Sequence, residues 1–102
     1  KLSEVVAGLP RRFMRKGAFP MPPRTVYSFL GSLRDALERS RGGGGADFTD
    51  GVLIRERDGW VHFRASNTEP LLRVIAEATR EDGLDPLWRR AERILQEGGV
   101  LP

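Results

Sequence analysis

Cysteine is absent from this 102-residue sequence, and histidine occurs once, at His62. Without cysteine there can be no disulfide and no thiolate metal site, and the redox compartment is left open. A lone histidine has no partner ligands, which argues against metal binding. No stretch approaches the roughly 20 apolar residues of a membrane span, and residues 1–6 lack the basic start and long apolar stretch of a secretory signal. We therefore expect one cytoplasmic domain with no membrane partner.

An excess of charge of one sign is also lacking, because 17 Lys and Arg stand against 14 Asp and Glu, a net charge of +3. A nucleic-acid-binding surface usually gathers basic residues on one face or interleaves them with stacking aromatics. One short basic cluster is visible, made of Arg11, Arg12, Arg15 and Lys16, and the other basic residues mostly alternate with acids. This pattern favours an ordinary solvated surface and no nucleic-acid partner. A small basic nucleic-acid-binding or protein-interaction α+β module is the alternative.

The first part of the chain predicts a linker, a strand and a helix. We expect residues 1–10 to be an incoming interdomain linker or hinge, and residues 11–102 to form the domain. Residues 12–21 fit a strand, although Gly17 interrupts it. Residues 24–40 predict a helix, because apolar side chains recur there at the spacing of one helical face. These side chains are Val26, Phe29, Leu30, Leu33, Ala36 and Leu37.

Four consecutive glycines, Gly42–Gly45, are expected to end that helix at Arg41. We interpret the glycine run as a surface loop. A phosphate cradle of the P-loop type would need a Lys followed by Ser or Thr after the glycines, and the sequence has no such pair there.

The middle of the chain predicts three strands, at about residues 52–57, 60–65 and 71–78. Asp58-Gly59 between the first two is typical of a tight hairpin in which both turn residues have positive φ. The third strand has an apolar residue at every second position along one face. Its apolar face consists of Leu72, Val74, Ala76 and Ala78.

A second helix is predicted over residues 86–97, with Asp85 as its N-cap and Pro86 at its first position. Gly98-Gly99 ends this helix. Trp88 lies off the apolar stripe of the helix, and we expect it either to pack half-buried or to contact another domain. The stripe consists of Leu87, Ala91, Ile94 and Leu95. The order of elements indicates an α+β domain, a largely antiparallel sheet of about four strands with two helices on one face.

The segment RASNTEP, residues 64–70, joins the second and third of the three central strands, so its side chains stand at the end of the sheet. Arg64 offers a planar fork of donors that suits a phosphate. Ser66 and Thr68 supply hydroxyls, Asn67 supplies an amide donor, and the turn exposes backbone N–H groups that can form an anion-binding nest. A Ser-Asn-Thr turn before a proline is also a common way to change chain direction. From these residues alone both interpretations stay open.

The same segment carries a resemblance to a known family. RASNTEP, followed by LLRV, resembles the signature of the C-terminal domain of the α-D-phosphohexomutases, the phosphoglucomutase and phosphomannomutase superfamily. The sequences DGV at 50–52 and DGW at 58–60 match the place where that domain carries its hairpin. The resemblance is specific over about residues 50–78, and it implies a fold like that of the TATA-box-binding protein.

The resemblance also implies roles for the loop residues. In the family this loop grips the phosphate of a bound hexose phosphate substrate. Its phosphate ligands here would be Arg64, Ser66, Asn67 and Thr68. Glu69 and Pro70 match the motif and would shape the loop. Asn67 leans toward the phosphomannomutase and phosphoglucomutase branch, since phosphoglucosamine mutases usually carry Gly at that place. Arg73 and Glu77 share one face of the following strand and are expected to pair across the sheet, with a role near the ligand left open.

The family interconverts hexose 1-phosphate and hexose 6-phosphate through a bisphosphate, and its reaction needs parts that this sequence lacks. The resemblance places a phosphoserine, an Asp-x-Asp-x-Asp magnesium loop and a sugar-recognition loop in three other domains. No Asp-x-Asp occurs in this sequence, and none of its candidate serines, Ser3, Ser28, Ser32 and Ser40, lies in a recognisable catalytic context. We therefore expect the fourth domain of a longer enzyme, with no catalytic residue, cofactor or metal of its own.

Overall fold

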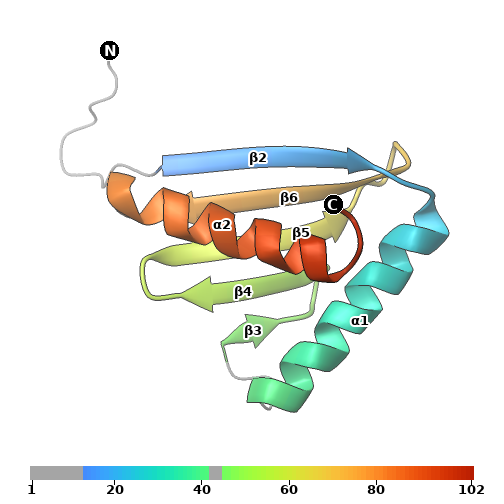
Figure 1. Ribbon diagram of the computed structural model, residues 1–102, viewed down its shortest axis with the longest axis horizontal. Helices are drawn as coiled ribbons and strands as arrows, with labels where there is room; N and C mark the ends of the chain where they lie inside the picture. Colours follow the sequence, from blue (N-terminus) through green and yellow to red (C-terminus); the bar gives the residue numbers. More distant parts are fainter. Residues whose placement is uncertain (1–12, 42–44) are drawn as a thin grey trace.

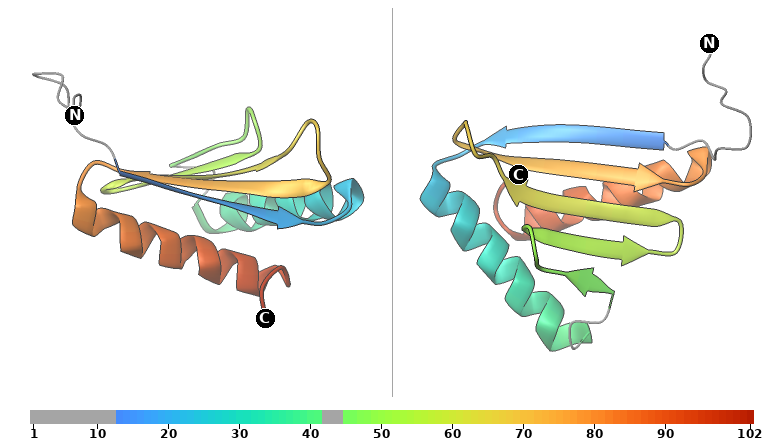
Figure 2. Two further views of the ribbon diagram at one scale, coloured as in Figure 1. Left: turned by 90° about the horizontal axis from the view of Figure 1, so that it is seen from above. Right: turned by 180° about the vertical axis from the view of Figure 1, so that it is seen from behind.

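A computed structural model describes residues 13–41 and 45–102 of the chain. Its five strands form one antiparallel sheet in the order β2-β6-β5-β4-β3 (Figure 1). The elements are β2 (Phe13–Pro20), α1 (Pro23–Arg41), β3 (Ala46–Asp47), β4 (Val52–Glu56), β5 (Gly59–Ala65), β6 (Leu71–Ala78) and α2 (Glu81–Glu97). Figure 2 shows both helices on the same face of the sheet, which confirms the predicted α+β class. The linker predicted at residues 1–10 lies outside the described residues.

Within the described residues the sheet has five strands where about four were expected, because β3 was not predicted. Its residues Ala46 and Asp47 pair with Ile54 and Leu53 of β4 and form one edge of the sheet. No helix within the described ranges is both long enough and apolar enough to cross a membrane.

Strand alternation separates a buried face of the sheet from an open one. In the pairing of β5 with β6, Val61 lies opposite Ala76, and Phe63 lies opposite Val74. All four side chains are fully buried beneath the helices, and the ring centroid of Phe29 on α1 lies 6.0 Å from that of Phe63. Burying a large apolar side chain contributes about 1.5–3 kcal/mol. The apolar face predicted for residues 71–78 is confirmed, because its four side chains are fully buried.

The hairpin between β4 and β5 lies where it was predicted, but its turn is built differently. Glu56 pairs with Gly59, so the turn residues are Arg57 and Asp58, and neither has a positive φ. The prediction of positive φ at Asp58 and Gly59 was therefore wrong. Gly59 is the first residue of β5, and an added Cβ there would lie 1.9 Å from the Glu77 backbone oxygen. Glycine is needed here because two strands approach each other closely.

Helix α2 begins at Glu81 rather than at residue 86, and Pro86 lies inside it. Asp85 is not the N-cap, because that position belongs to Arg80, which is extended (φ −131°, ψ 149°) and makes no side-chain capping bond. A proline removes one hydrogen bond of the helix, a cost that packing can offset. The first turn is fastened to the β4–β5 hairpin, since the Arg80 guanidinium lies 3.7 Å from the Asp58 carboxylate.

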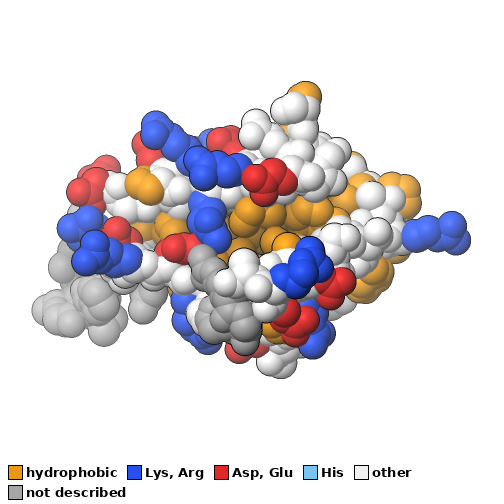
Figure 3. Space-filling model, turned by 60° about the horizontal axis from the view of Figure 1, so that its bottom comes forward, with side chains coloured by type: hydrophobic (Ala, Val, Ile, Leu, Met, Phe, Trp, Pro, Cys, Tyr) orange, Lys and Arg blue, Asp and Glu red, His pale blue; other side chains and the backbone are white. Residues whose placement is uncertain are grey.

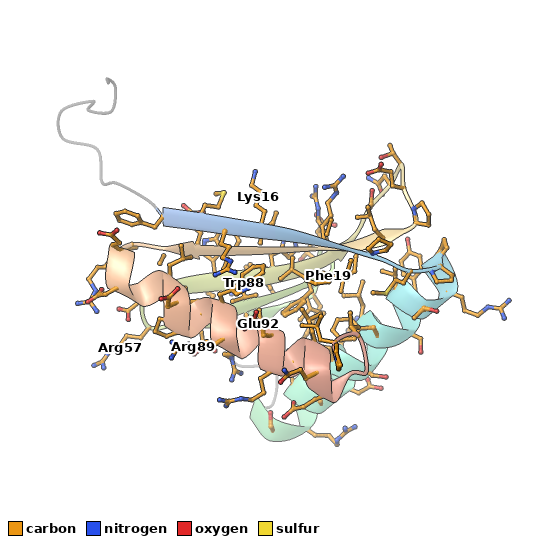
Figure 4. All side chains as sticks on the ribbon, turned by 45° about the horizontal axis from the view of Figure 1, so that its top comes forward. Lys16, Phe19, Arg57, Trp88, Arg89 and Glu92 are labelled. Atoms are coloured by element: carbon orange, nitrogen blue, oxygen red, sulfur yellow. The ribbon has the colours of Figure 1, made fainter. Side chains whose placement is uncertain are left out.

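Trp88 belongs to the core and lies between α2 and β2 (Figure 4). Its side chain is only 6% exposed, and the Arg15 guanidinium stacks 4.8 Å from the centre of its ring. The prediction of half-buried packing for Trp88 therefore underestimated its burial, and little of its surface is left for contact with another domain. Ile94, by contrast, was predicted on the apolar stripe of α2 and is only half-buried.

Replacing Gly59 with alanine should destabilise the domain, because the new Cβ would overlap backbone atoms of β6. Overpacking of this kind costs about 1–3 kcal/mol. Gly31→Ala is the matched control, since a Cβ there meets nothing within 4 Å beyond its own helix, and alanine in a helix interior stabilises by about 0.5–1 kcal/mol. Urea unfolding of both variants measures the difference. Equal unfolding free energies would contradict close strand approach as the reason for Gly59.

Candidate phosphate-binding site

Residues 66–70 connect β5 to β6 and rise from the face of the sheet opposite the helices (Figure 2). The loop is closed at its base, because the Ser66 N–H donates to the Leu71 carbonyl at 3.2 Å. It is also tied to the segment before α1, where the Met21 N–H donates to the Pro70 carbonyl at 3.0 Å. The loop predicted between two adjacent strands is therefore anchored at both ends.

The Ser66 side chain organises the tip of this loop from within. Its Oγ accepts the N–H of Thr68 at 3.3 Å and the N–H of Glu69 at 3.2 Å. Serine braces many turns in this way. Because Oγ acts as the acceptor in both bonds, the hydroxyl hydrogen can be donated outward. Asn67 and Thr68 are exposed at the tip.

Two arginines lie side by side next to the loop, because Arg64 of β5 pairs with Arg73 of β6. Like charges in such positions repel, but each guanidinium has a nearby carboxylate. Arg64 Nη1 lies 3.7 Å from Asp50 Oδ2, and Arg73 Nη2 lies 3.4 Å from Glu69 Oε1. The expectation that Arg73 pairs across the sheet was wrong, since its partner lies in the loop. Exposed pairs of this kind contribute about 0–1 kcal/mol, so another anion can replace either carboxylate.

A groove of about 400 Å³ runs along this part of the open face. It is lined by the four residues that the sequence singled out, Arg64, Ser66, Asn67 and Thr68. It is also lined by Lys16 and Asp50, which the sequence did not connect with the loop, and by Arg73, for which a role near the ligand was left open. Lys16 extends from β2 on the side away from α2 (Figure 4). Three cationic side chains and one carboxylate therefore line the same groove, and the excess of positive charge attracts anions.

The turn between β3 and β4 brings Asp50 to the groove. Within this turn, Asp47 Oδ1 accepts the N–H of Thr49 at 2.8 Å. That bond, with a smaller contribution from the Arg55 charge, holds the pKa of Asp47 below its usual value. Asp47 lies 3.8 Å from Arg55 and is not part of the groove lining.

A larger cavity, of about 630 Å³, lies between β2, α1 and the C-terminal end of α2. Among the described side chains that line it, Glu97 is the only ionisable one, so it offers no cation to an anionic ligand. In the described part of the chain, no three His, Asp or Glu side chains gather closely enough to hold a metal ion.

Comparison with known proteins identifies related sequences. A sequence model described as "Phosphoglucomutase/phosphomannomutase, C-terminal domain" matches residues 30–94. A probable phosphoglucosamine mutase of Methanocella arvoryzae is 31% identical over 96 residues, which cover 94% of this chain and 22% of that protein. A phosphoglucomutase/phosphomannomutase of Thermococcus kodakarensis is 30% identical over 99 residues, which cover 95% of this chain and 21% of that protein.

The fold has a counterpart among solved structures. A phosphoglucomutase/phosphomannomutase family protein from Burkholderia thailandensis matches with a TM-score of 0.69 at 24% identity, over 90% of this chain and 19% of that chain. The chain thus spans about a fifth of the length of the proteins it matches. The family match covers more than half of the sequence and includes the whole loop between β5 and β6. This chain belongs to the family of phosphoglucomutase/phosphomannomutase C-terminal domains.

Proposed function

We propose that the loop at residues 64–70 binds the phosphate group of a hexose phosphate, as the phosphate-gripping part of a longer phosphohexomutase. The observation that carries this proposal is the groove in which Arg64, Arg73 and Lys16 converge beside the hydroxyls of the loop. Guanidinium forks and hydroxyl donors suit the tetrahedral oxygens of a phosphate. The N–H groups of Ser66, Thr68 and Glu69 are already donated within the loop, so the side chains would supply most of the donors.

The parent enzyme would interconvert hexose 1-phosphate and hexose 6-phosphate through a bisphosphorylated sugar. This loop would hold the phosphate that is not reacting, in either orientation of the sugar. Arg64, Ser66 and Thr68 suit that task, because they recognise phosphate geometry and not a pattern of sugar hydroxyls. The phosphoserine and magnesium implied by the resemblance belong to other domains, so the residues of this chain would bind and orient the substrate only.

We assign the selection of the sugar to parts of the enzyme beyond this chain. Relatives at about 30% identity carry the names of phosphoglucosamine mutases as well as of a phosphoglucomutase/phosphomannomutase. Asn67 favours the second group by resemblance, but the loop grips the phosphate end of the ligand. Glucose, mannose and glucosamine phosphates therefore all fit this proposal.

Nucleic-acid binding, the alternative, gains no support from the surface. Six arginines of the described part lie within 4 Å of an acidic side chain, namely Arg34, Arg55, Arg64, Arg73, Arg80 and Arg90. Acidic and basic side chains are interspersed on the face shown in Figure 3. The predicted basic cluster is divided by strand alternation, since Arg15 stacks on Trp88 while Lys16 lines the groove. Its first two members lie outside the described residues.

Inorganic phosphate titrated into ¹⁵N-labelled protein should shift the amide signals of Ser66, Asn67 and Thr68 most. Arg64 can donate two charge-assisted hydrogen bonds, each worth about 1.5–3 kcal/mol before costs. Immobilisation and solvent exposure should leave a dissociation constant on the order of millimolar. Arg64→Lys keeps the charge but loses the fork, so it should weaken binding about threefold to tenfold.

Arg89→Lys, on the exposed side of α2, is the matched control and should leave phosphate binding unchanged. The proposal fails if the largest shifts map away from residues 66–68, or if Arg64→Lys and Arg89→Lys bind phosphate as tightly as the unchanged chain.

The chain by itself should show no mutase activity, because it carries no nucleophile and no metal loop. Purified protein would be assayed with glucose, mannose and glucosamine 1-phosphates, with and without magnesium. In a full-length parent enzyme, Arg64→Lys should lower kcat/KM for its sugars alike, since the loop contacts the phosphate. Turnover by the chain above a buffer blank would contradict this division of roles, and so would an effect of Arg64→Lys on one sugar alone.

A further inference from the structure

Asp50 is the only carboxylate among the described residues that line the groove. We propose that Asp50 is a built-in competitor of the phosphate. Its carboxylate pairs with the Arg64 guanidinium while no ligand is bound, and phosphate displaces it on binding. The carboxylate therefore limits the affinity of the loop for phosphate. This inference rests on the proposed phosphate site and adds a residue that limits how tightly that site holds its ligand.

The position of Asp50 is fixed by the structure around its turn. The His62 Nε2–H donates to the Asp50 carbonyl oxygen. Gly51 has φ 79°, and a Cβ there would lie 2.2 Å from a backbone oxygen of β5, so the turn rests directly on that strand. The Arg34 guanidinium on α1 lies 4.9 Å from the ring centre of Phe48 and holds the other side of the turn. The backbone is held while the Asp50 side chain remains 73% exposed and can rotate.

The Asp50 carboxylate competes with phosphate more than it helps to orient the Arg64 guanidinium. Asp50 Oδ2 lies 3.7 Å from Arg64 Nη1, so a phosphate on the same guanidinium must come close to the carboxylate or displace it. The carboxylate attracts a single guanidinium charge, but it repels the two charges of a phosphate dianion at a similar distance. Because both side chains are well exposed, the attraction within the pair is weak. Removing the carboxylate charge should therefore tighten phosphate binding.

A carboxylate beside an anion can also act as an acceptor for a protonated phosphate oxygen. Sulfate separates the two roles, because near neutral pH it has no proton to donate. A competitor weakens the binding of phosphate and sulfate alike. An acceptor favours phosphate over sulfate, so its removal would weaken phosphate binding.

The experiment compares the 102-residue chain with its Asp50→Asn and Asp47→Asn variants. Asp47→Asn is the matched control, because it removes the same charge from the same turn, keeps an Oδ1 acceptor for the Thr49 N–H, and lies outside the groove lining. Phosphate and sulfate are titrated at constant ionic strength while the amide signals of residues 66–68 are followed. Asp50→Asn should tighten both anions about threefold to tenfold, which corresponds to about 0.7–1.4 kcal/mol. Asp47→Asn should change either affinity less than about twofold, since its charge is farther from the ligand.

Each other outcome overturns the proposal. Unchanged affinities in Asp50→Asn, or weaker phosphate with tighter sulfate, would reject competition and leave the phosphate site itself standing. Equal tightening in both variants would show a general effect of net charge. No response at residues 66–68 in any of the three proteins would reject the phosphate site, and the competitor with it.

Discussion

The antiparallel pairing of β5 with β6 decides where the other parts of the domain can lie. Phe63 and Val74 face each other in that pairing, and both are fully buried under the helices. The next pair, Arg64 and Arg73, must point to the opposite face, because side chains alternate along a strand. A slip of one residue would turn arginines into the core and apolar side chains into water. The core therefore fixes the register, and the register places two guanidiniums side by side.

Elements with a long repeating pattern could be predicted from the sequence, because burial repeats along them. Residues 71–78 and the helix over 24–40 are of this kind. The strand Ala46–Asp47 is too short to show any alternation, and only pairing with β4 defines it. The predicted start of α2 was wrong. Asp85-Pro86 is a strong local signal for the beginning of a helix, whereas the contact of Arg80 with Asp58 depends on the folded hairpin.

In the candidate site, too, only the residues that are neighbours in the sequence could be predicted together. Its loop residues are contiguous in a recognisable motif, so the sequence could single them out, and their role as phosphate ligands stays a prediction. Lys16, Asp50 and Arg73 reach the groove from three separate parts of the chain. No spacing in the sequence indicates that they meet, because the sheet order β2-β6-β5-β4 brings them together. The close approach of β5 to β6 at Gly59 could not be predicted from the sequence for the same reason, since it depends on a neighbouring strand.

The loop between β5 and β6 rises from the face of the sheet that carries neither α1 nor α2 (Figure 2), and its side chains line the groove. In the chain by itself, water reaches Arg64 and Arg73, and its high dielectric constant weakens every charged contact made there. A surface laid over this face would expel that water and strengthen the same contacts without moving a single atom of the loop. The strength with which the groove would hold an anion therefore depends on whatever covers the sheet as much as on the residues that would touch the ligand.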